Sequence, residues 1–219
     1  MRKKYTREAA FAFLCLAGFF CSCNRTEPKI SYGFMELVYY QAEAGPLERF
    51  SFFIIPNDED GIENLDELYL YHDREQLRWL FKSNDWVSVT QDGRTWIGSR
   101  GIAAAGDGIL PRGQYRAVLV NKGGEKSERL FAFDTPESPR FPFPALEINE
   151  DQYTVTSAYP ENRLVCYDAE GNYVSTVNLS ALSGSLSNLN FPSNARIAAL
   201  WAEDPQYFTS AFTDAVSLR

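Results

Sequence analysis

Short runs of alternating or wholly apolar positions, separated by Gly, Pro, Asn and Asp, fill the chain after residue 29. Residues 30–41 carry aromatic and aliphatic side chains on both faces of an extended segment. Residues 49–56 form a shorter, mostly apolar run with turn residues on either side. Patterns of this kind are typical of β-strands, and the second is typical of a strand buried on both faces. The chain is therefore predicted to be all-β.

Further strands are expected at regular spacing along the chain. Residues 77–81 and 86–90 are expected to pair with each other, and residues 163–167 and 173–177 to form a hairpin around the turn sequence DAEGN. The other expected strands are residues 65–71, 95–98, 110–120, 129–133, 153–157, 195–202 and 206–212, with a loop and a short strand within residues 179–189. Short strands with turn signals at this spacing predict a β-sandwich rather than a helical or α/β fold.

Residues 110–115 have the sequence L-P-x-G-x-Y. This stretch resembles the corner that leads into the next-to-last strand of immunoglobulin-like and fibronectin type III domains. The resemblance covers residues 30–135, and it implies that the hydroxyl group of Tyr115 bonds to the backbone. The Cys…Trp…Cys pattern of antibody domains is absent from the sequence.

Prolines mark the expected boundary between two domains. Four of them lie within residues 134–144, where they stiffen the chain and remove backbone donors. We expect a linker at residues 136–144, between a first sandwich at residues 30–135 and a smaller one at residues 145–219. The second half repeats the style of the first, which favours tandem immunoglobulin-like or fibronectin type III-like sandwiches. Because no residue-level repeat proves duplication, a single extended sandwich is the alternative.

The N-terminus has the pattern of an export signal. Four basic residues accompany an uncharged run at residues 9–20, which is shorter than the roughly 20 residues of a membrane-spanning helix. Cys23 follows the small residue Ser22, and this resembles the lipobox of bacterial lipoproteins, in the relaxed form of spirochaetes. The resemblance implies a diacylated, palmitate-bearing Cys23 as the first residue of the mature protein.

On this interpretation, residues 1–22 are a lipoprotein signal peptide and residues 23–29 a polar tether. Ordinary secretory cleavage and an uncleaved anchor are the alternatives, and the bulky Phe20 argues against the former. Buried acyl chains contribute about 0.8 kcal/mol per CH₂ group, so two or three of them hold a protein on a bilayer. The expected location is therefore the cell membrane or outer membrane, on its extracytoplasmic side.

Charge and cysteine content narrow the expected partners. The chain has a formal charge of −8, and residues 1–22 carry four basic and one acidic side chain, so the remainder carries −11. Without a cluster of Lys and Arg, nucleic acid is not an expected partner, and an anionic lipid surface would repel the protein. Cys166 would be the single unmodified cysteine of the mature chain, so no intramolecular disulfide is expected.

His72 is the only histidine, so a Ser–His–Asp or Cys–His catalytic site would have to use it. It follows a predicted strand and precedes Asp73, and a solvent-facing residue at the strand end is the favoured interpretation. A zinc site is not expected, because only His72 and Cys166 are free to supply the nitrogen and sulfur ligands that zinc favours.

The acidic loop after residue 56 is the best metal candidate. Asp58, Asp60 and Glu67 keep part of the spacing of an EF-hand calcium loop. Pro56 occupies the first ligand position, however, and no helix pair is expected around the loop. A solvated loop between strands is the favoured interpretation, and no metal or other cofactor is expected.

Cys166 alternates onto the same face as Leu164, which predicts a buried side chain rather than a reactive thiol. The four tryptophans lie in apolar strand contexts, which favours core packing over a carbohydrate-stacking surface. They are Trp79, Trp86, Trp96 and Trp201. We find no phosphate loop, nucleotide fingerprint or paired-carboxylate motif, so no residue is assigned a catalytic role.

The leading functional hypothesis is a non-catalytic, membrane-anchored envelope lipoprotein that acts in protein interaction or envelope structure. The alternative is a module that binds a glycan or another envelope ligand through exposed tryptophans. An envelope hydrolase that uses carboxylates is a third hypothesis, although no carboxylate is singled out. A sandwich fold does not decide among these hypotheses.

Overall fold

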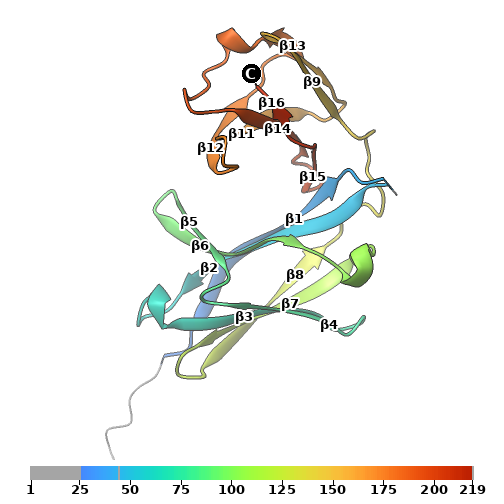
Figure 1. Cartoon of the computed structure of the whole chain (residues 1–219). Helices are drawn as coiled ribbons and strands as arrows, with labels where there is room; N and C mark the ends of the chain where they lie inside the picture. Colours follow the sequence, from blue (N-terminus) through green and yellow to red (C-terminus); the bar gives the residue numbers. More distant parts are fainter. Residues whose placement is uncertain (1–25, 44, 219) are drawn as a thin grey trace, which may run out of the picture.

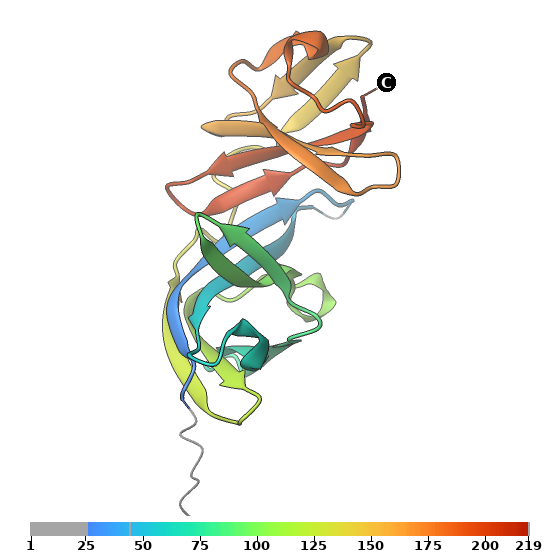
Figure 2. The same ribbon diagram turned by 90° about the vertical axis from the view of Figure 1, so that its left-hand side faces the viewer.

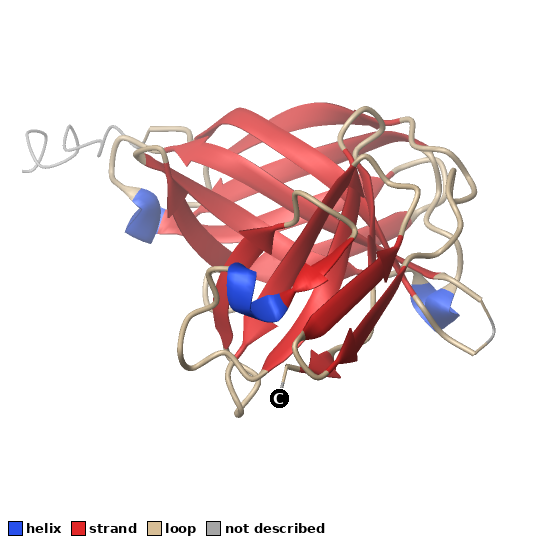
Figure 3. Ribbon diagram, turned by 90° about the horizontal axis from the view of Figure 1, so that it is seen from above, coloured by secondary structure: helices blue, strands red, loops and turns tan. Residues whose placement is uncertain are grey.

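The computed structural model describes residues 26–43 and 45–218, which form strands and three short 3-10 helices. Eight strands build a first sandwich from two facing sheets, in the orders β1-β2-β6-β5 and β4-β3-β7-β8 (Figure 1). These strands are β1 (Lys29–Tyr40), β2 (Leu47–Asn57), β3 (Leu65–His72), β4 (Leu77–Lys82), β5 (Val87–Gln91), β6 (Arg94–Ile102), β7 (Gly113–Asn121) and β8 (Lys126–Phe133). The 3-10 helices are η2 (Ile62–Asn64), η3 (Ala105–Asp107) and η4 (Leu186–Asn188), at the periphery of the strands (Figure 3).

A second sandwich follows with sheets in the orders β9-β10-β13 and β12-β11-β14-β15, and with β16 beside β14. Its strands are β9 (Ala145–Asn149), β10 (Gln152–Thr156), β11 (Glu161–Tyr167), β12 (Tyr173–Asn178), β13 (Ser183–Ser185), β14 (Ile197–Asp204), β15 (Thr209–Phe212) and β16 (Val216–Ser217). When the strands of the first sandwich are lettered A, B, C, C′, D, E, F and G in chain order, the sheet β1-β2-β6-β5 reads A-B-E-D and faces the sheet C′-C-F-G. In the second sandwich, the sheet β9-β10-β13 reads A-B-E and also faces a sheet C′-C-F-G. This is the strand order of immunoglobulin-like sandwiches, and it confirms the predicted fold class.

The predicted corner is present in the first sandwich. The hydroxyl group of Tyr115 donates a hydrogen bond of 2.8 Å to the carbonyl oxygen of Pro111, and the Tyr115 side chain is fully buried. β7, which begins beside this corner, is the next-to-last strand of the first sandwich. The backbone bond inferred from the L-P-x-G-x-Y stretch is therefore confirmed.

Aromatic rings fill the first core. The ring of Phe50 from β2 lies 5.3 Å from that of Tyr115 on β7 and 5.2 Å from that of Phe133 on β8, so it joins the two facing sheets. In the second sandwich, Leu164 and Leu200 are fully buried on neighbouring strands. Buried aromatic and aliphatic side chains of this kind replace the disulfide that antibody domains use.

One predicted strand pairing is wrong. β4 pairs with β3 and β5 pairs with β6, so the two strands expected to pair lie in different sheets. The reason is the turn at Asp92 and Gly93, whose positive φ angles of 51° and 70° suit a two-residue hairpin and fix β5 against β6. The predicted β11–β12 hairpin is confirmed, and the carboxylate of Asp168 accepts a hydrogen bond from the amide of Asn172 inside its turn.

The two sandwiches share a sheet. β1 of the first pairs in parallel with β15 of the second, from Leu37 opposite Thr209 to Tyr40 opposite Phe212. This pairing, here called the joint, creates one nine-stranded sheet in the order β12-β11-β14-β15-β1-β2-β6-β5, with β16 attached. The sandwiches follow one another along the long axis of the molecule (Figure 2). The division into domains at residues 136–144 stays a prediction.

Candidate functional site

A buried ion pair holds the chain where it leaves the first sandwich. The guanidinium group of Arg112 donates to both carboxylate oxygens of Glu48, at 2.9 and 2.7 Å, and the two side chains are only 13% and 6% exposed. The same group donates to the carbonyl oxygens of Thr135 and Pro136, at 3.1 and 2.7 Å. Bidentate pairing with additional carbonyl acceptors is the arrangement in which arginine best tolerates burial.

A second ion pair attaches the following segment to the second sandwich. Arg140 donates to the buried carboxylate of Asp204 at 2.9 Å, and its guanidinium group lies 4.0 Å from the centre of the Tyr207 ring. The segment between the sandwiches is therefore tied to both of them, and the joint is held from the side as well as through its backbone bonds.

Strand alternation defines the outward side of the shared sheet. On β1, Met35, Leu37 and Tyr39 are buried in the first core, so the residues between them point to the other side. We call this other side, over both sandwiches, the joint face. Its aromatic members include Tyr32, Phe34, Tyr40, Phe53, Trp96, Trp201 and Phe212. Its charged members include Glu36, Arg49, Arg100, Arg163 and Glu203.

An aromatic cluster covers the part of the joint face that belongs to the first sandwich. The ring of Trp96 makes edge contacts with Tyr32 at 5.8 Å and with Phe34 at 5.5 Å. Phe34 stacks on Phe53 at 5.8 Å. Tyr32 is 53% exposed. Solvent-facing rings packed against each other form a ready contact surface.

Arg163 is the centre of the part of the joint face that belongs to the second sandwich. Its guanidinium group bonds to Glu203 at 2.5 Å and to Glu161, and it lies 5.2 Å from the centre of the Trp201 ring. Arginine held over an aromatic ring by carboxylates on either side is fixed in orientation, so the surface is preorganised.

Two carboxylates of the joint face are destabilised in their charged forms. Burial raises the pKa of Glu36, while a hydrogen bond of 2.7 Å from the hydroxyl group of Ser210 partly opposes the shift. Burial also raises the pKa of Glu203, and the positive charge of Arg163 opposes it. Glu36 lies on β1 and Ser210 on β15, so this polar contact spans the joint.

The shared sheet curls around the joint face. Burial raises the pKa of Tyr167 on β11, with a further contribution from Tyr40, while the charge of Arg100 on β6 lowers it. Five strand spacings separate β6 from β11, which is about 24 Å across a flat sheet at about 4.8 Å each. The β5–β6 and β11–β12 hairpins nevertheless lie on one side of the molecule, so the sheet is curved rather than flat (Figures 1 and 2).

The structure places His72 differently from the sequence prediction. Its side chain is 1% exposed and its ring lies 4.8 Å from that of Tyr115, so the solvent-facing interpretation is wrong. The amide of Glu75 donates to Nδ1, which leaves the hydrogen on Nε2 to bond the carbonyl oxygen of Arg112 at 3.2 Å. His72 thus has a structural role at the tyrosine corner. Its burial depends on corner residues that are distant in the sequence.

The tryptophans divide into two groups. Trp79 and Trp86 pack against the core, as predicted. Trp96 and Trp201 lie on the joint face, so the prediction of core packing is wrong for these two. Strand alternation alone does not reveal which side of a strand faces the core when both sides are apolar.

Cys166 is fully buried, as predicted, and burial raises the pKa of its thiol. Its Sγ atom lies 3.8 Å from the carbonyl oxygen of Leu164. A buried thiol with a raised pKa forms little thiolate, so this cysteine is suited to packing rather than to chemistry.

The carboxylates of the calcium candidate lie in two separate sets of hydrogen bonds. Asp58 accepts from the amide of Asp60 at 2.9 Å and from the side chain of Asn64 at 3.2 Å. Glu67 lies on β3 and accepts a bond of 2.6 Å from the hydroxyl group of Tyr69. Within residues 26–43 and 45–218, no three His, Cys, Asp or Glu side chains are grouped so that they could hold a metal ion.

Cys23, the predicted lipidation site, and the predicted signal peptide lie outside the described residues. Over the part of the chain that the structure describes, no helix has the length and apolar character needed to cross a membrane.

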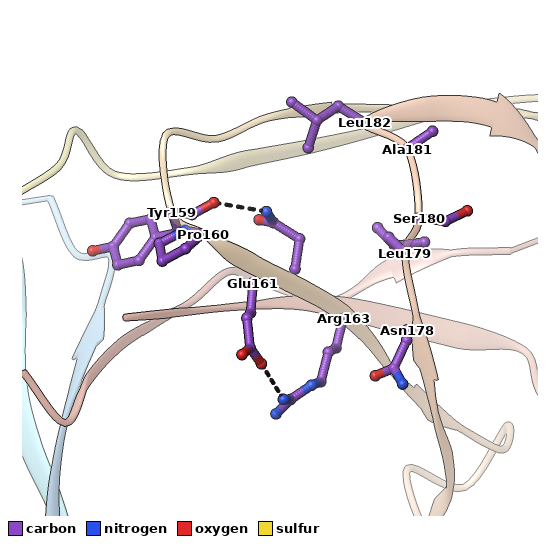
Figure 4. A pocket seen from close by; sticks show the side chains of 10 residues that line it. Tyr159, Pro160, Glu161, Arg163, Asn178, Leu179, Ser180, Ala181 and Leu182 are labelled. Carbon is purple, nitrogen blue, oxygen red and sulfur yellow. Dashed lines mark hydrogen bonds and ion pairs between the residues drawn. The ribbon is translucent and has the colours of Figure 1, made fainter. Parts of the chain in front are cut away.

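A pocket of about 430 Å³ lies between the start of β11 and the segment that follows β12 (Figure 4). Asn162 donates to the carbonyl oxygen of Tyr159 at 3.0 Å, and its Oδ1 atom is buried without a hydrogen-bond partner among the described residues. Glu161 and Arg163 point toward each other at the same pocket (Figure 4). Through Arg163 the pocket adjoins the joint face.

The strand order and the tyrosine corner define an all-β protein with immunoglobulin-like sandwiches. No known protein-family profile matches the chain, and no curated protein sequence is similar to it. It is similar to the crystal structure of Dpr11 IG1 bound to DIP-gamma IG+IG2, with 15% identity, a TM-score of 0.27, and coverage of 88% of this chain and 98% of that chain. It is also similar to the crystal structure of DIP-gamma IG1+IG2, with 14% identity, a TM-score of 0.26, and coverage of 88% and 94%. Because both TM-scores are low, the fold assignment rests on the strand order and not on these two similarities.

Proposed function

We propose that this protein is a non-catalytic, membrane-anchored lipoprotein of the cell envelope that binds a protein partner through its joint face. The observation that carries the proposal is the set of aromatic and arginine side chains that point away from both cores on one side of the shared sheet. Aromatic and arginine side chains contribute most of the binding free energy in protein interfaces.

The joint face is suited to binding because it is fixed before a partner arrives. Its side chains stand on strands, and the joint and the two tying ion pairs hold the sandwiches together. Less conformational entropy is lost when a rigid surface binds, so more of the contact free energy appears as affinity.

The position of the N-terminus supports the anchoring part of the proposal. The carbonyl oxygen of Thr26 accepts a bond of 3.1 Å from the side chain of Asn121, at the end of β7 that lies far from the joint. β1 has 12 residues and runs toward the second sandwich, and its 11 residue-to-residue steps span about 36 Å at about 3.3 Å each. A protein anchored through Cys23 would hold its joint well clear of the bilayer.

Site-specific photo-crosslinking in cells tests the binding face. A photoreactive phenylalanine analogue replaces Tyr32 on the joint face, and the matched control replaces Leu130, which is 55% exposed on β8 in another sheet. We expect a discrete adduct with a different protein from position 32 and none from position 130. An equal pattern from the two positions, or no adduct from position 32, would contradict the proposal.

Metabolic labelling tests the anchor separately. A palmitate analogue with a clickable group should label the wild-type chain, and Cys23→Ser should abolish the label and move the protein into the aqueous phase of a detergent partition. Labelling that persists in Cys23→Ser would place the lipid on another residue. A wild-type chain without label would contradict the lipoprotein assignment.

Glycan binding is the second candidate function, and the outward position of Trp96 and Trp201 favours it. A sugar ring that stacks on either indole should change the tryptophan emission. Titration with soluble envelope glycans should therefore give a saturable change that Trp96→Ala or Trp201→Ala removes, while unchanged emission across the set would refute this candidate.

A further inference from the structure

The two free edges of the shared sheet differ from the other exposed strand edges in residues 26–43 and 45–218. β5 and β12 end the strand order, and neither contains a charged residue. The edge strands β4, β8 and β9 of the other sheets each carry Lys, Arg or Glu, while β13 has only three residues and β16 only two. Charged side chains on an edge oppose pairing with another chain, so β5 and β12 lack this protection.

The edges that are already paired at the joint have the same composition. Residues 37–40 of β1 and residues 209–212 of β15 contain no charged side chain. β1 is one edge of the first-sandwich sheet β1-β2-β6-β5, and β15 is one edge of the second-sandwich sheet β12-β11-β14-β15. The joint is therefore an edge-to-edge pair between these two sheets. β5 and β12 are the remaining edges of the same two sheets.

β12 has backbone groups available for pairing. The amide of Leu179 donates to the carbonyl oxygen of Asn162 at 3.0 Å. Because antiparallel pairing alternates, every second residue of β12 counted back from Leu179 forms backbone hydrogen bonds with β11. Thr176 and Asn178 are the residues between them, so their amide and carbonyl groups point away from β11. Both side chains are exposed.

β5 has matching groups. The two-residue turn at residues 92–93 makes Gln91 and Arg94 a hydrogen-bonded pair, and the register alternates from there. Ser88 and Thr90 therefore direct their amide and carbonyl groups away from β6, and both side chains are exposed. The two free edges are also similar in length, with five residues in β5 and six in β12.

We propose that the protein self-associates by pairing β12 of one copy with β5 of a second copy, in continuity with the joint. Followed through the shared sheet, β5 and β12 run in the same direction, so the new pair is parallel, as β1 and β15 are. Both edges lie on one accessible side of the molecule (Figures 1 and 2). The contact uses backbone groups at the ends of the sheet, so it is separable from partner binding by joint-face side chains.

Sedimentation velocity of the full chain in detergent, over a wide range of concentration, tests this pairing. The edge variants are Thr176→Lys on β12 and Thr90→Lys on β5, and the control is Asn149→Lys, an exposed position on the charged edge β9. We expect concentration-dependent association of the wild-type chain. Each edge variant should raise the dissociation constant at least about tenfold, and the control should leave it unchanged.

Mixing the two edge variants distinguishes this pairing from others. Thr176→Lys keeps an intact β5 and Thr90→Lys keeps an intact β12, so an equimolar mixture should form a one-to-one dimer although each variant alone is monomeric. A wild-type chain that stays monomeric overturns the proposal. So does a Thr90→Lys variant that associates like the wild type, because that result indicates pairing between two β12 edges. Equal urea midpoints for all variants confirm that folding is intact, and the crosslink at position 32 reports on partner binding independently.

Discussion

Replacing Arg112 by methionine is expected to destabilise the protein strongly. The change leaves the carboxylate of Glu48, whose side chain is 6% exposed, with the amide of Leu110 at 2.9 Å as its remaining hydrogen-bond donor. Removal of one partner from a buried ion pair costs about 3–5 kcal/mol, because the other charge stays buried and uncompensated. For a chain of this size, such a loss lowers the melting temperature by roughly 10 °C.

Two comparisons separate this effect from a general effect of removing charge. Glu48→Gln leaves the Arg112 charge buried without its carboxylate, with the carbonyl oxygens of Thr135 and Pro136 as remaining acceptors, so a cost of the same size, about 3–5 kcal/mol, is expected. Arg116→Met removes the same type of side chain from an ion pair with Asp73, whose side chain is 61% exposed, and solvent-exposed pairs contribute about 0–1 kcal/mol.

Urea unfolding followed by tryptophan emission measures all three variants, with calorimetry to show whether the two sandwiches unfold together. Arg112→Met and Glu48→Gln are both expected to be more destabilising than Arg116→Met. An Arg112→Met variant no less stable than Arg116→Met would refute the reasoning that the buried pair ties the chain between the sandwiches.

Three further variants test other parts of the fold. Tyr115→Phe removes the hydroxyl donor to Pro111 and should cost about 1–3 kcal/mol in urea unfolding, while a neutral result would mean that the corner bond contributes nothing. Gly98→Ala would place a methyl group 2.0 Å from the carbonyl oxygen of Phe52, so it should separate β6 from β2 and cost about 3 kcal/mol or more. Its urea midpoint should therefore be lower than that of Ser88→Ala, an exposed control position. Burial raises the pKa of Glu36 above its unfolded value of 4.5, so the folded state binds a proton on this carboxylate more tightly than the unfolded state does. The stability that results is fully present below pH 4.5 and is lost as the pH rises through the pKa of the folded state. Glu36→Gln should therefore stabilise the protein at pH 7 relative to wild type and flatten the dependence of the urea midpoint on pH above 4.5, and an unchanged slope would contradict this assignment.

The sequence predicted most strands because hydrophobic alternation and turn residues are local signals. The L-P-x-G-x-Y stretch also predicted the bond of Tyr115, since the acceptor Pro111 is only four residues away. β9 was not predicted, because Ala145–Asn149 directly follows a proline-rich segment that gives a linker signal. β15 has only four residues and pairs in parallel with β1, more than 160 positions earlier, so no local pattern indicated the joint.

The joint face was only partly visible in the sequence. β1 carries apolar residues on both sides, with Glu36 among those that prove to face outward, and this charge was the one signal of a second, solvent-facing side. Which side meets the core depends on the facing sheet, and therefore on residues distant in sequence. For the same reason the sequence pattern alone predicts Trp96 and Trp201 in the core and His72 facing the solvent.

The parallel joint also determines how the molecule would respond to mechanical load. A single strand, β1, runs from the N-terminal end of the first sandwich to the joint, where β15 lies beside its last four residues. Tension between an anchored N-terminus and a partner held by the second sandwich would act along these strands. The hydrogen bonds of the joint would then bear the force in shear, all together, rather than being peeled apart in sequence. The two sandwiches would thus transmit a pull as one stiff rod instead of hinging at the segment between them.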